Sequence, residues 1–450
     1  MTFRKIKNIF KTDDARSGNV RINILYSAIL KIVGLSCSLF IVPVTLGYLN
    51  NEVYGIWLTM SSILFWFTFF DVGLGNGMRN YLAEAFSLKD YDKARSYIST
   101  TFIMLLGLAL IIAVIAIVPV SLLDMNSVFN TNAISGIELR KVLIVALIFT
   151  FALFVVKNIG LVFVAMQRYA VNDLLSVSGS VLALLVVYVL TKVTEGNLMY
   201  VVLAFTGIPV AVYVLAAIPV FSKYKYLRPS ISSLDYKLGK KIVGKGLGFF
   251  FIQITSCLVI YGSSNLFITQ FCGPADVTVY NIAYKFFNML AIAYTIVISP
   301  MWNAYTDAYV KGDMLWISKT FKKAMKLWAL SVVGGVLMLM TCNFFYAIWV
   351  GDAVTVPLSV SVVVFLYISM FNLNNCVTYL LNGLNKIRVQ IYTSVFFTAA
   401  YLVIVNIFGG SSGIIGIVAC MAICYALMAA IHFYQCCILI KEKAKGIWNK

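Results

Sequence analysis

Apolar runs of about twenty residues recur along the chain and are separated by short polar stretches. A run of this length, wound as an α-helix, spans the hydrocarbon core of a bilayer. The pattern therefore predicts an all-α membrane protein with twelve transmembrane helices. The predicted spans cover residues 23–46, 53–71, 99–120, 141–165, 173–191, 198–221, 247–270, 277–300, 325–349, 357–382, 391–408 and 414–437.

The distribution of lysine and arginine tests this topology, because both residues concentrate in cytoplasmic loops. The chain has 35 Lys and Arg against 17 Asp and Glu, a formal net charge of +18. With both termini in the cytoplasm, 29 of the 35 fall in cytoplasmic segments, three in outside loops and three within spans. This imbalance supports the twelve spans and the orientation. It also explains the basic charge without a nucleic-acid partner.

The composition agrees with a lipid-exposed surface. Hydrophobic residues make up 61% of the chain and charged residues 12%, whereas soluble domains carry about twice that charged fraction. The stretch before the first span is too charged and too long for a cleaved signal peptide, so we expect the first span to remain as a signal anchor. The single histidine, His432, is explained better by packing than by catalysis.

Two stretches that follow the second and eighth spans resemble each other. Residues 80–90 read NYLAEAFSLKD and residues 303–313 read NAYTDAYVKGD, at an offset of 223. This match favours duplication of a six-span unit. Six spans return the chain to the same side, so the halves should be related by an axis along the membrane normal. The predicted domains are an N-terminal six-helix lobe (1–221), a basic cytoplasmic connector (222–246) and a C-terminal six-helix lobe (247–450).

Three lysines, Lys31, Lys157 and Lys285, lie inside predicted spans, and no acidic residue lies at their depth in the predicted topology. A charged side chain at the centre of a span costs about 2.5–3.5 kcal/mol on insertion scales. We therefore expect these side chains to face a polar cavity. The alternative is that each long side chain carries its charge to an interface.

Polar residues recur at helical spacing beside these lysines. Asn281 and Asn288 share a face with Lys285, and Asn375 belongs to an asparagine-rich stripe on the span 357–382. Such stripes line water or form interhelical hydrogen bonds, and both interpretations stay open. On the functional interpretation, the substrate-binding candidates are Lys31, Lys157, Lys285, Asn281, Asn288 and Asn375.

A glycine-rich stretch, DVGLGNGMRN, follows the second span at residues 71–80. No strand precedes it, so a nucleotide-binding loop is a poor interpretation. A flexible membrane exit is plainer, and an ion pair between Asp71 and Arg79 is a candidate cytoplasmic gate. No catalytic or metal-binding arrangement stands out along the chain. We therefore expect no enzymatic activity, no metal and no cofactor.

Three motifs lie close together around the second span and the loop after it. They are YGIWLT at 54–59, FDVGLGNGMRNYLAE at 70–84 and DYDKAR at 90–95. Together they resemble the polysaccharide biosynthesis flippases, the Wzx-type O-antigen and capsule-unit transporters. That family belongs to the multidrug/oligosaccharidyl-lipid/polysaccharide exporter (MOP) superfamily. The length and the span number extend the resemblance more loosely over the whole chain.

The resemblance implies two six-helix lobes around a V-shaped cavity with alternating access. It implies transfer of an undecaprenyl-diphosphate-linked oligosaccharide, an O-antigen or capsule repeat unit, from the cytoplasmic to the periplasmic leaflet of the bacterial inner membrane. Membrane lipids, a polysaccharide polymerase and a chain-length regulator are the partners it suggests. The cationic cavity of the family is matched by Lys31, Lys157 and Lys285 in residue type and depth.

Two other functions compete with this interpretation. A cation-coupled multidrug exporter of the same fold would need a buried acid, and the predicted spans supply none. A membrane-bound O-antigen polymerase or ligase would be an enzyme with a large outside loop for its chemistry. The longest predicted outside loop, 121–140, is too short for that role.

Overall fold

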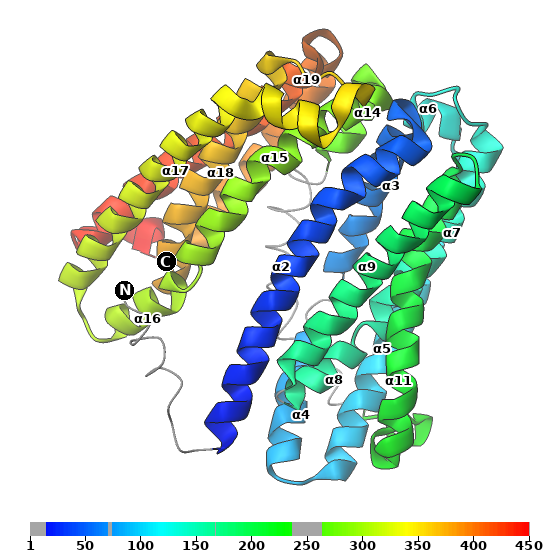
Figure 1. Cartoon of the computed structure of the whole chain (residues 1–450). Coiled ribbons are helices and arrows are strands. Elements are labelled where there is room, and N and C mark those ends of the chain that lie inside the picture. The colour runs from blue at the N-terminus through cyan, green and yellow to red at the C-terminus, as the bar shows by residue number, and fades with distance from the viewer. Residues whose placement is uncertain (1–14, 71–73, 167, 236–262, 450) are drawn as a thin grey trace. The chain divides into compact units, whose positions relative to one another are not determined.

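The computed structural model describes residues 15–70, 74–166, 168–235 and 263–449. This part of the chain is almost entirely helical and contains no strand (Figure 1). Within it, nine helical segments are long and apolar enough to cross a bilayer. The chain is therefore a multi-pass, all-α membrane protein, as the apolar pattern predicts.

The helices before residue 236 begin with a long one, and most are separated by short turns. In chain order they are α2 (Ala15–Leu49), α3 (Asn51–Trp66), η1 (Phe67–Phe69), α4 (Leu74–Ser87), α5 (Tyr91–Leu122), α6 (Met125–Phe129), α7 (Gly136–Val156), α8 (Ile159–Ala165), α9 (Tyr169–Val193), α10 (Leu198–Val202), the π-helical η2 (Leu203–Gly207), α11 (Ile208–Lys223), η3 (Lys225–Leu227) and η4 (Ile231–Ser233).

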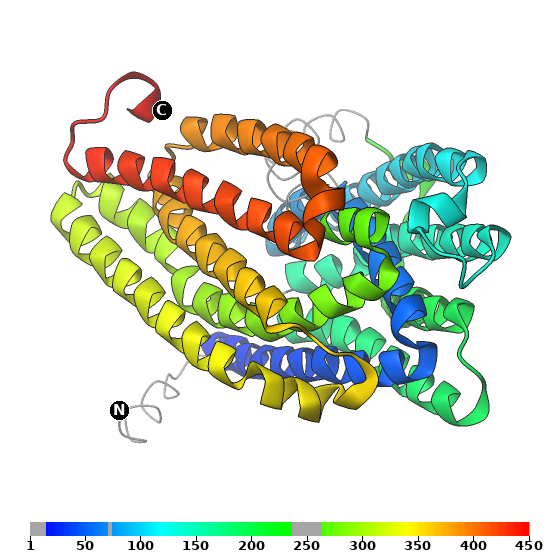
Figure 2. The same ribbon diagram turned by 90° about the horizontal axis from the view of Figure 1, so that it is seen from above.

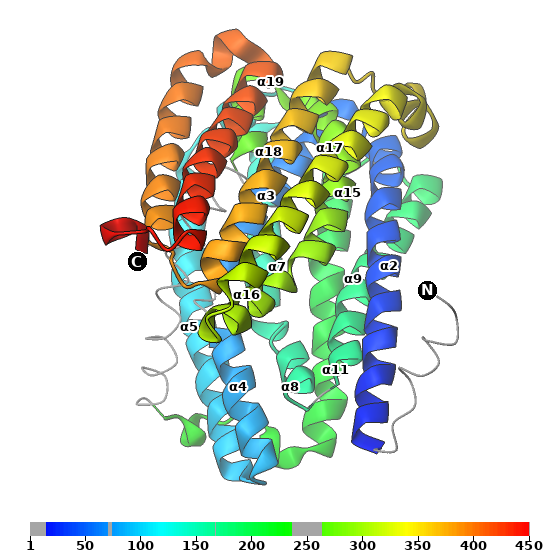
Figure 3. The same cartoon turned by 90° about the vertical axis from the view of Figure 1, so that its left-hand side faces the viewer.

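The helices after residue 262 include three long ones that lie side by side, α15, α17 and α18 (Figure 3). In chain order the elements are α14 (Ser264–Cys272), α15 (Pro274–Ile298), α16 (Met301–Val310), α17 (Met314–Trp349), η6 (Gly351–Ala353), α18 (Leu358–Gly383), α19 (Arg388–Ile440) and η7 (Gly446–Asn449).

The nine candidate segments are compatible with the twelve predicted spans. α19 covers two of the predicted spans, because it bends at Gly413, where φ is 59° and ψ is −159°. Figure 2 shows its two arms running back along each other. α3 has only 16 residues and is too short to count by length alone. Most of the predicted span 247–270 lies outside the described residues.

The chain divides into two compact units. The first consists of Met1–Asn50, Leu64–Met125 and Ile134–Phe251, and the second of Asn51–Ile63, Asn126–Ala133 and Ile252–Lys450. Most of α3 therefore packs with the C-terminal helices, although α3 lies far before the connector (222–246) in the sequence. Thr278 shows this packing, because its hydroxyl donates to the Asn51 carbonyl at 2.8 Å within the second unit.

The repeated sequence motif forms the same helix–turn–helix in both units. Asp90 lies between α4 and α5, and Asp313 lies between α16 and α17. The Asp90 carboxylate accepts a hydrogen bond from the Lys93 N–H at 3.1 Å, and that of Asp313 accepts one from the Trp316 N–H at 2.9 Å. Each aspartate thereby caps the helix that follows it.

The backbone of the turn before each aspartate is also similar in the two units. Lys89 and Gly312 both have a positive φ, 58° and 73° respectively. The N–H of each aspartate donates to the carbonyl of the alanine five residues earlier, at 2.9 Å in both units. The sequence repeat is therefore also a repeat of local structure.

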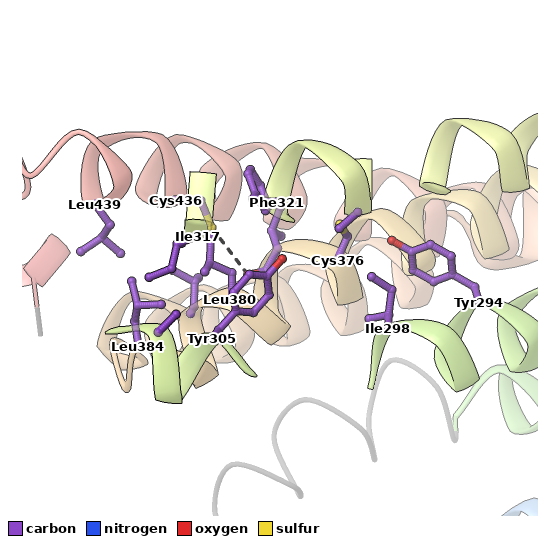
Figure 4. Packing of buried hydrophobic residues seen from close by; sticks show 14 residues of the cluster. Tyr294, Ile298, Tyr305, Ile317, Phe321, Cys376, Leu380, Leu384, Cys436 and Leu439 are labelled. Atoms are coloured by element: carbon purple, nitrogen blue, oxygen red, sulfur yellow. Dashed lines mark hydrogen bonds between the residues drawn. The ribbon is translucent and has the colours of Figure 1, made fainter. Parts of the chain in front are cut away.

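The hydrophobic cores around these turns use equivalent positions. Four buried residues of the first unit have buried counterparts 223 residues later in the second. Figure 4 shows three of these counterparts, Tyr305, Ile317 and Phe321, within one cluster. The pairs are Leu82 with Tyr305, Ala85 with Ala308, Ala94 with Ile317, and Ile98 with Phe321. In the second unit the Cys436 thiol, in the same cluster, donates to the Val377 carbonyl at 3.5 Å. Each turn is thus fixed by its own core.

Candidate functional site

Lys157 lies at a break between two helices rather than inside a continuous one. α7 ends at Val156 and α8 begins at Ile159, so Lys157 caps the C-terminus of α7. The ammonium lies 5.6 Å from the centre of the Phe154 ring, a cation–π contact. This contact lowers the energetic cost of a charge within the span 141–165.

The break is held closely by its surroundings. The Asn158 side chain is buried and donates to the carbonyls of Phe154 and Val155 at 2.9 and 3.2 Å. A Cβ on Gly75 would lie 2.3 Å from the Asn158 Oδ1, so the start of α4 approaches this side chain without room for a larger residue. Lys157 therefore sits on a rigid support.

Lys31 lies on an exposed part of α2. Its side chain is exposed, and so are most side chains from Ile29 to Phe40 on the same helix. No carboxylate of the described residues lies within salt-bridge distance of its ammonium. Whether Lys31 faces a cavity stays a prediction.

Lys285 and the two asparagines near it lie on α15, in three different settings. Asn281 is buried, and its amide donates to Asn265 Oδ1 and to the Val277 carbonyl, both at 2.8 Å. Lys285, about one turn later, is partly exposed. Asn288 is also partly exposed and accepts a hydrogen bond from the Tyr284 hydroxyl at 3.3 Å. Lys285 and Asn288 are therefore partly accessible, whereas Asn281 has its amide hydrogens occupied within the protein.

The partner of Asn281 belongs to a buried polar network that the sequence pattern does not reveal. The Asn265 amide of α14 donates to the Ser62 hydroxyl of α3 at 2.6 Å. The hydroxyls of Thr59 and Thr269 lie 2.5 Å apart in the same group of helices. Buried polar groups of this kind join helices in a lipid environment, because no water is present to satisfy them. In the sequence, the polar run Ser263–Asn265 within an apolar segment was the signal that could have indicated this network.

Some asparagines of α18 are buried, and others are partly exposed. Asn372 is fully buried, and neither its amide nitrogen nor its carbonyl oxygen has a hydrogen-bond partner among the described residues. Asn375 is partly exposed. The Oδ1 of Asn374, between them, accepts a hydrogen bond from His432 Nδ1 at 3.0 Å. Asn375 is thus more open to a ligand than Asn372.

His432 joins three helical segments through this contact. Its Nε2 lies 2.8 Å from the Thr393 hydroxyl on the other arm of α19, and its side chain is fully buried. The histidine therefore fastens the two arms of α19 to α18. This is the packing role expected from the sequence.

The candidate gate is only partly described. Arg79 lies in α4, partly exposed, whereas Asp71 lies outside the described residues. The ion pair between them stays a prediction. The lysines are likewise divided between the compact units, with Lys31 and Lys157 in the first and Lys285 in the second. Their convergence on one cavity also stays a prediction. Among the described residues, no cluster of His, Cys, Asp and Glu could hold a metal ion.

Two relatives in sequence carry the same name. The chain is 22% identical over 318 residues to the "Putative O-antigen transporter" of Salmonella typhi, covering 69% of this chain and 68% of the relative. It is 24% identical over 326 residues to the protein of that name from Salmonella typhimurium, covering 70% of each. None of the protein-family models matches the chain.

Solved structures of low sequence identity share the fold. An inward-facing multidrug resistance MATE family transporter of the MOP superfamily aligns with a TM-score of 0.75 and 15% identity, over 92% of this chain and 98% of that structure. An outward-facing member aligns with a TM-score of 0.60 and 16% identity, over 97% and 100%. The chain therefore has the fold of MOP-superfamily transporters, and its two relatives confirm the resemblance to O-antigen transporters that the motifs around the second span indicate.

Proposed function

We propose that the chain is a flippase for a lipid-linked oligosaccharide in the bacterial inner membrane. It moves an undecaprenyl-diphosphate-linked O-antigen or capsule repeat unit from the cytoplasmic to the periplasmic leaflet. Transport proceeds by alternating access. The N- and C-termini lie in the cytoplasm, and the domains follow the lobes 1–221 and 247–450. The O-antigen transporter relatives and the MOP fold support this proposal.

The observation that carries the proposal is the presence of basic side chains within the spans. Lys31 is exposed and Lys285 partly exposed, and neither has a carboxylate partner among the described residues. A diphosphate is the anion that such cations would attract, and an ammonium binds it as a compact point charge. The partly exposed amides of Asn288 and Asn375 suit the sugar hydroxyls. A drug exporter that carries cations would be opposed by these charges.

The experiment replaces the lysines in a strain that depends on this protein for surface polysaccharide. Each hydrogen bond to a charged group contributes about 1.5–3 kcal/mol, so each Lys→Gln change should weaken binding roughly ten- to a hundredfold. We expect Lys31→Gln, Lys157→Gln and Lys285→Gln to reduce export at matched protein levels. The Lys→Arg variants should retain most of it, because they keep the charge.

Lys192→Gln is the matched control, because this lysine lies in the last turn of α9, at the predicted outside end. Its replacement removes one positive charge and should leave export unchanged. Normal export by the triple Lys→Gln variant would contradict the proposed role of the lysines. Resistance to cationic drugs that depends on the chain would favour the multidrug exporter instead.

A further inference from the structure

The first part of α17 carries a stripe of lysines that the proposed transport cavity does not use. The stripe consists of Lys319, Lys322, Lys323 and Lys326, all exposed. The spacing is i, i+3, i+4 and i+7, which places the four side chains on one face of the helix. α17 contains no acidic residue. None of the four ammonium groups has a carboxylate partner among the described residues.

The opposite face of the same turns is fixed in the core. Ile317, Thr320, Phe321 and Ala324 are buried, and three of them belong to the hydrophobic cluster of the second unit. The helix therefore cannot rotate to bring the lysines inward. The nearby Lys311 differs, because its ammonium pairs with Asp307 at 2.7 Å.

The lysine face continues along α17 as an exposed apolar face. The side chains that follow at helical spacing are between 58% and 78% exposed, and they are Leu330, Val333, Leu337, Met340, Phe344 and Ile348. An unbroken apolar face of this length on a membrane-spanning helix is suited to lipid rather than to a water-filled cavity. The lysines thus lie on the lipid-facing side of the molecule.

The length of the apolar face places the lysines at the level of the lipid head groups. From Lys326 to Ile348 the helix advances 22 residues, roughly 33 Å at about 1.5 Å per residue, which matches the hydrocarbon thickness of a bilayer. Exposed aromatic residues gather at the same end, namely Trp302, Tyr309 and Trp316. Tryptophan and tyrosine are enriched at this depth of a membrane protein.

We propose that Lys319, Lys322, Lys323 and Lys326 form a binding surface for anionic phospholipid head groups. Loop lysines that only set the topology need no common face, whereas these four align with the lipid-facing stripe. Their charge is complementary to the phosphates of phosphatidylglycerol and cardiolipin in the adjoining leaflet. The proposal does not depend on the transported substrate, because the surface faces the surrounding lipid.

The test measures lipid binding by the purified full-length protein, using native mass spectrometry with phosphatidylglycerol or phosphatidylcholine. The variant Lys319→Gln/Lys322→Gln/Lys326→Gln removes three charges from the stripe. Juxtamembrane lysines each strengthen binding to anionic lipid by roughly fivefold. We therefore expect about a hundredfold weaker phosphatidylglycerol binding and unchanged phosphatidylcholine binding. The equivalent triple Lys→Arg variant should bind like the wild type.

The matched control is Lys441→Gln/Lys443→Gln/Lys445→Gln, which removes three exposed lysines after α19. It should retain phosphatidylglycerol binding. Equal loss in both triple variants would overturn the proposal, because net charge alone would then explain the binding. Unchanged binding in the stripe variant would overturn it as well. Loss of undecaprenyl diphosphate binding without loss of phosphatidylglycerol binding would assign the surface to substrate capture and would also overturn it.

Discussion

Gly55 illustrates how a single residue decides the packing of α3. A Cβ at this position would lie 1.8 Å from the carbonyl oxygen of Pro274, which is backbone and cannot rotate away. Gly55 is buried in the second unit, where α3 meets the start of α15. The glycine therefore permits the close approach of two helices that small residues commonly allow in membranes.

We expect Gly55→Ala to destabilise the protein, because the backbone of α15 must shift to admit the methyl group. Overpacking of this kind costs about 1–3 kcal/mol. Gly107→Ala on α5 is the control, because a Cβ there meets no atom within 4 Å. Thermal unfolding of the two purified variants in detergent checks this. A melting temperature for Gly55→Ala equal to that of the control would show that the two helices are not tightly apposed.

Some features of the candidate site could not be predicted from the sequence. The depth of Lys157 was predictable from the apolar run, but the helix break that supports it was not, because Asn158 and Gly160 are tolerated in continuous helices too. Asn281 and Asn288 look equivalent in the sequence, yet only Asn281 is buried against Asn265. Helical spacing gives the face of a side chain but not the helix that covers it.

At the scale of elements, the aspartate-capped turn between α4 and α5 has a consequence for stability in acid. The side-chain and backbone hydrogen bonds from Lys93 lower the pKa of the Asp90 carboxyl below its ordinary value. A carboxyl whose pKa is lower in the folded state contributes stability above its unfolded pKa of about 3.9, and that stability is lost as the pH falls through the folded pKa.

We therefore expect Asp90→Asn to unfold more easily than the wild type near neutral pH, with the difference shrinking as the pH falls below about 3.9. Asp92→Asn, two residues later and exposed, is the control for the loss of one negative charge. Thermal unfolding followed across this pH range provides the measurement. A constant difference between Asp90→Asn and the wild type at every pH would mean that the ionised carboxylate is not what stabilises the turn.

The elements that the sequence predicted best are the long apolar helices. Span length and hydropathy identified α9 and α18 within a few residues, because the bilayer imposes one length on them. The bend at Gly413 falls between the predicted spans 391–408 and 414–437. The packing of most of α3 with the second unit was not predictable, because it depends on contacts such as that between Thr278 and Asn51 rather than on the pattern of one helix.

For the whole molecule, the repeat and the charge bias predict one topology that labelling can test. We expect single cysteines at Lys89 and Lys319 to react with a membrane-impermeant reagent only from the cytoplasm. Cysteines at Asn51 and Asp352 should react from the periplasm. Lys89 and Gly312 occupy equivalent turns, so both turns should be labelled from the same side of the membrane. Labelling of Lys319 from outside would exclude two units of equal orientation.

The most direct test of the proposed function is transport of the lipid-linked oligosaccharide in a purified system. The full-length protein would be reconstituted into proteoliposomes that carry an undecaprenyl-diphosphate-linked oligosaccharide, and a sugar-modifying enzyme would report its appearance in the opposite leaflet. The account predicts that the wild type accelerates this transfer, and that the triple variant Lys31→Gln/Lys157→Gln/Lys285→Gln slows it at least tenfold while Lys192→Gln does not. Transfer by the wild type no faster than in protein-free liposomes would contradict the flippase.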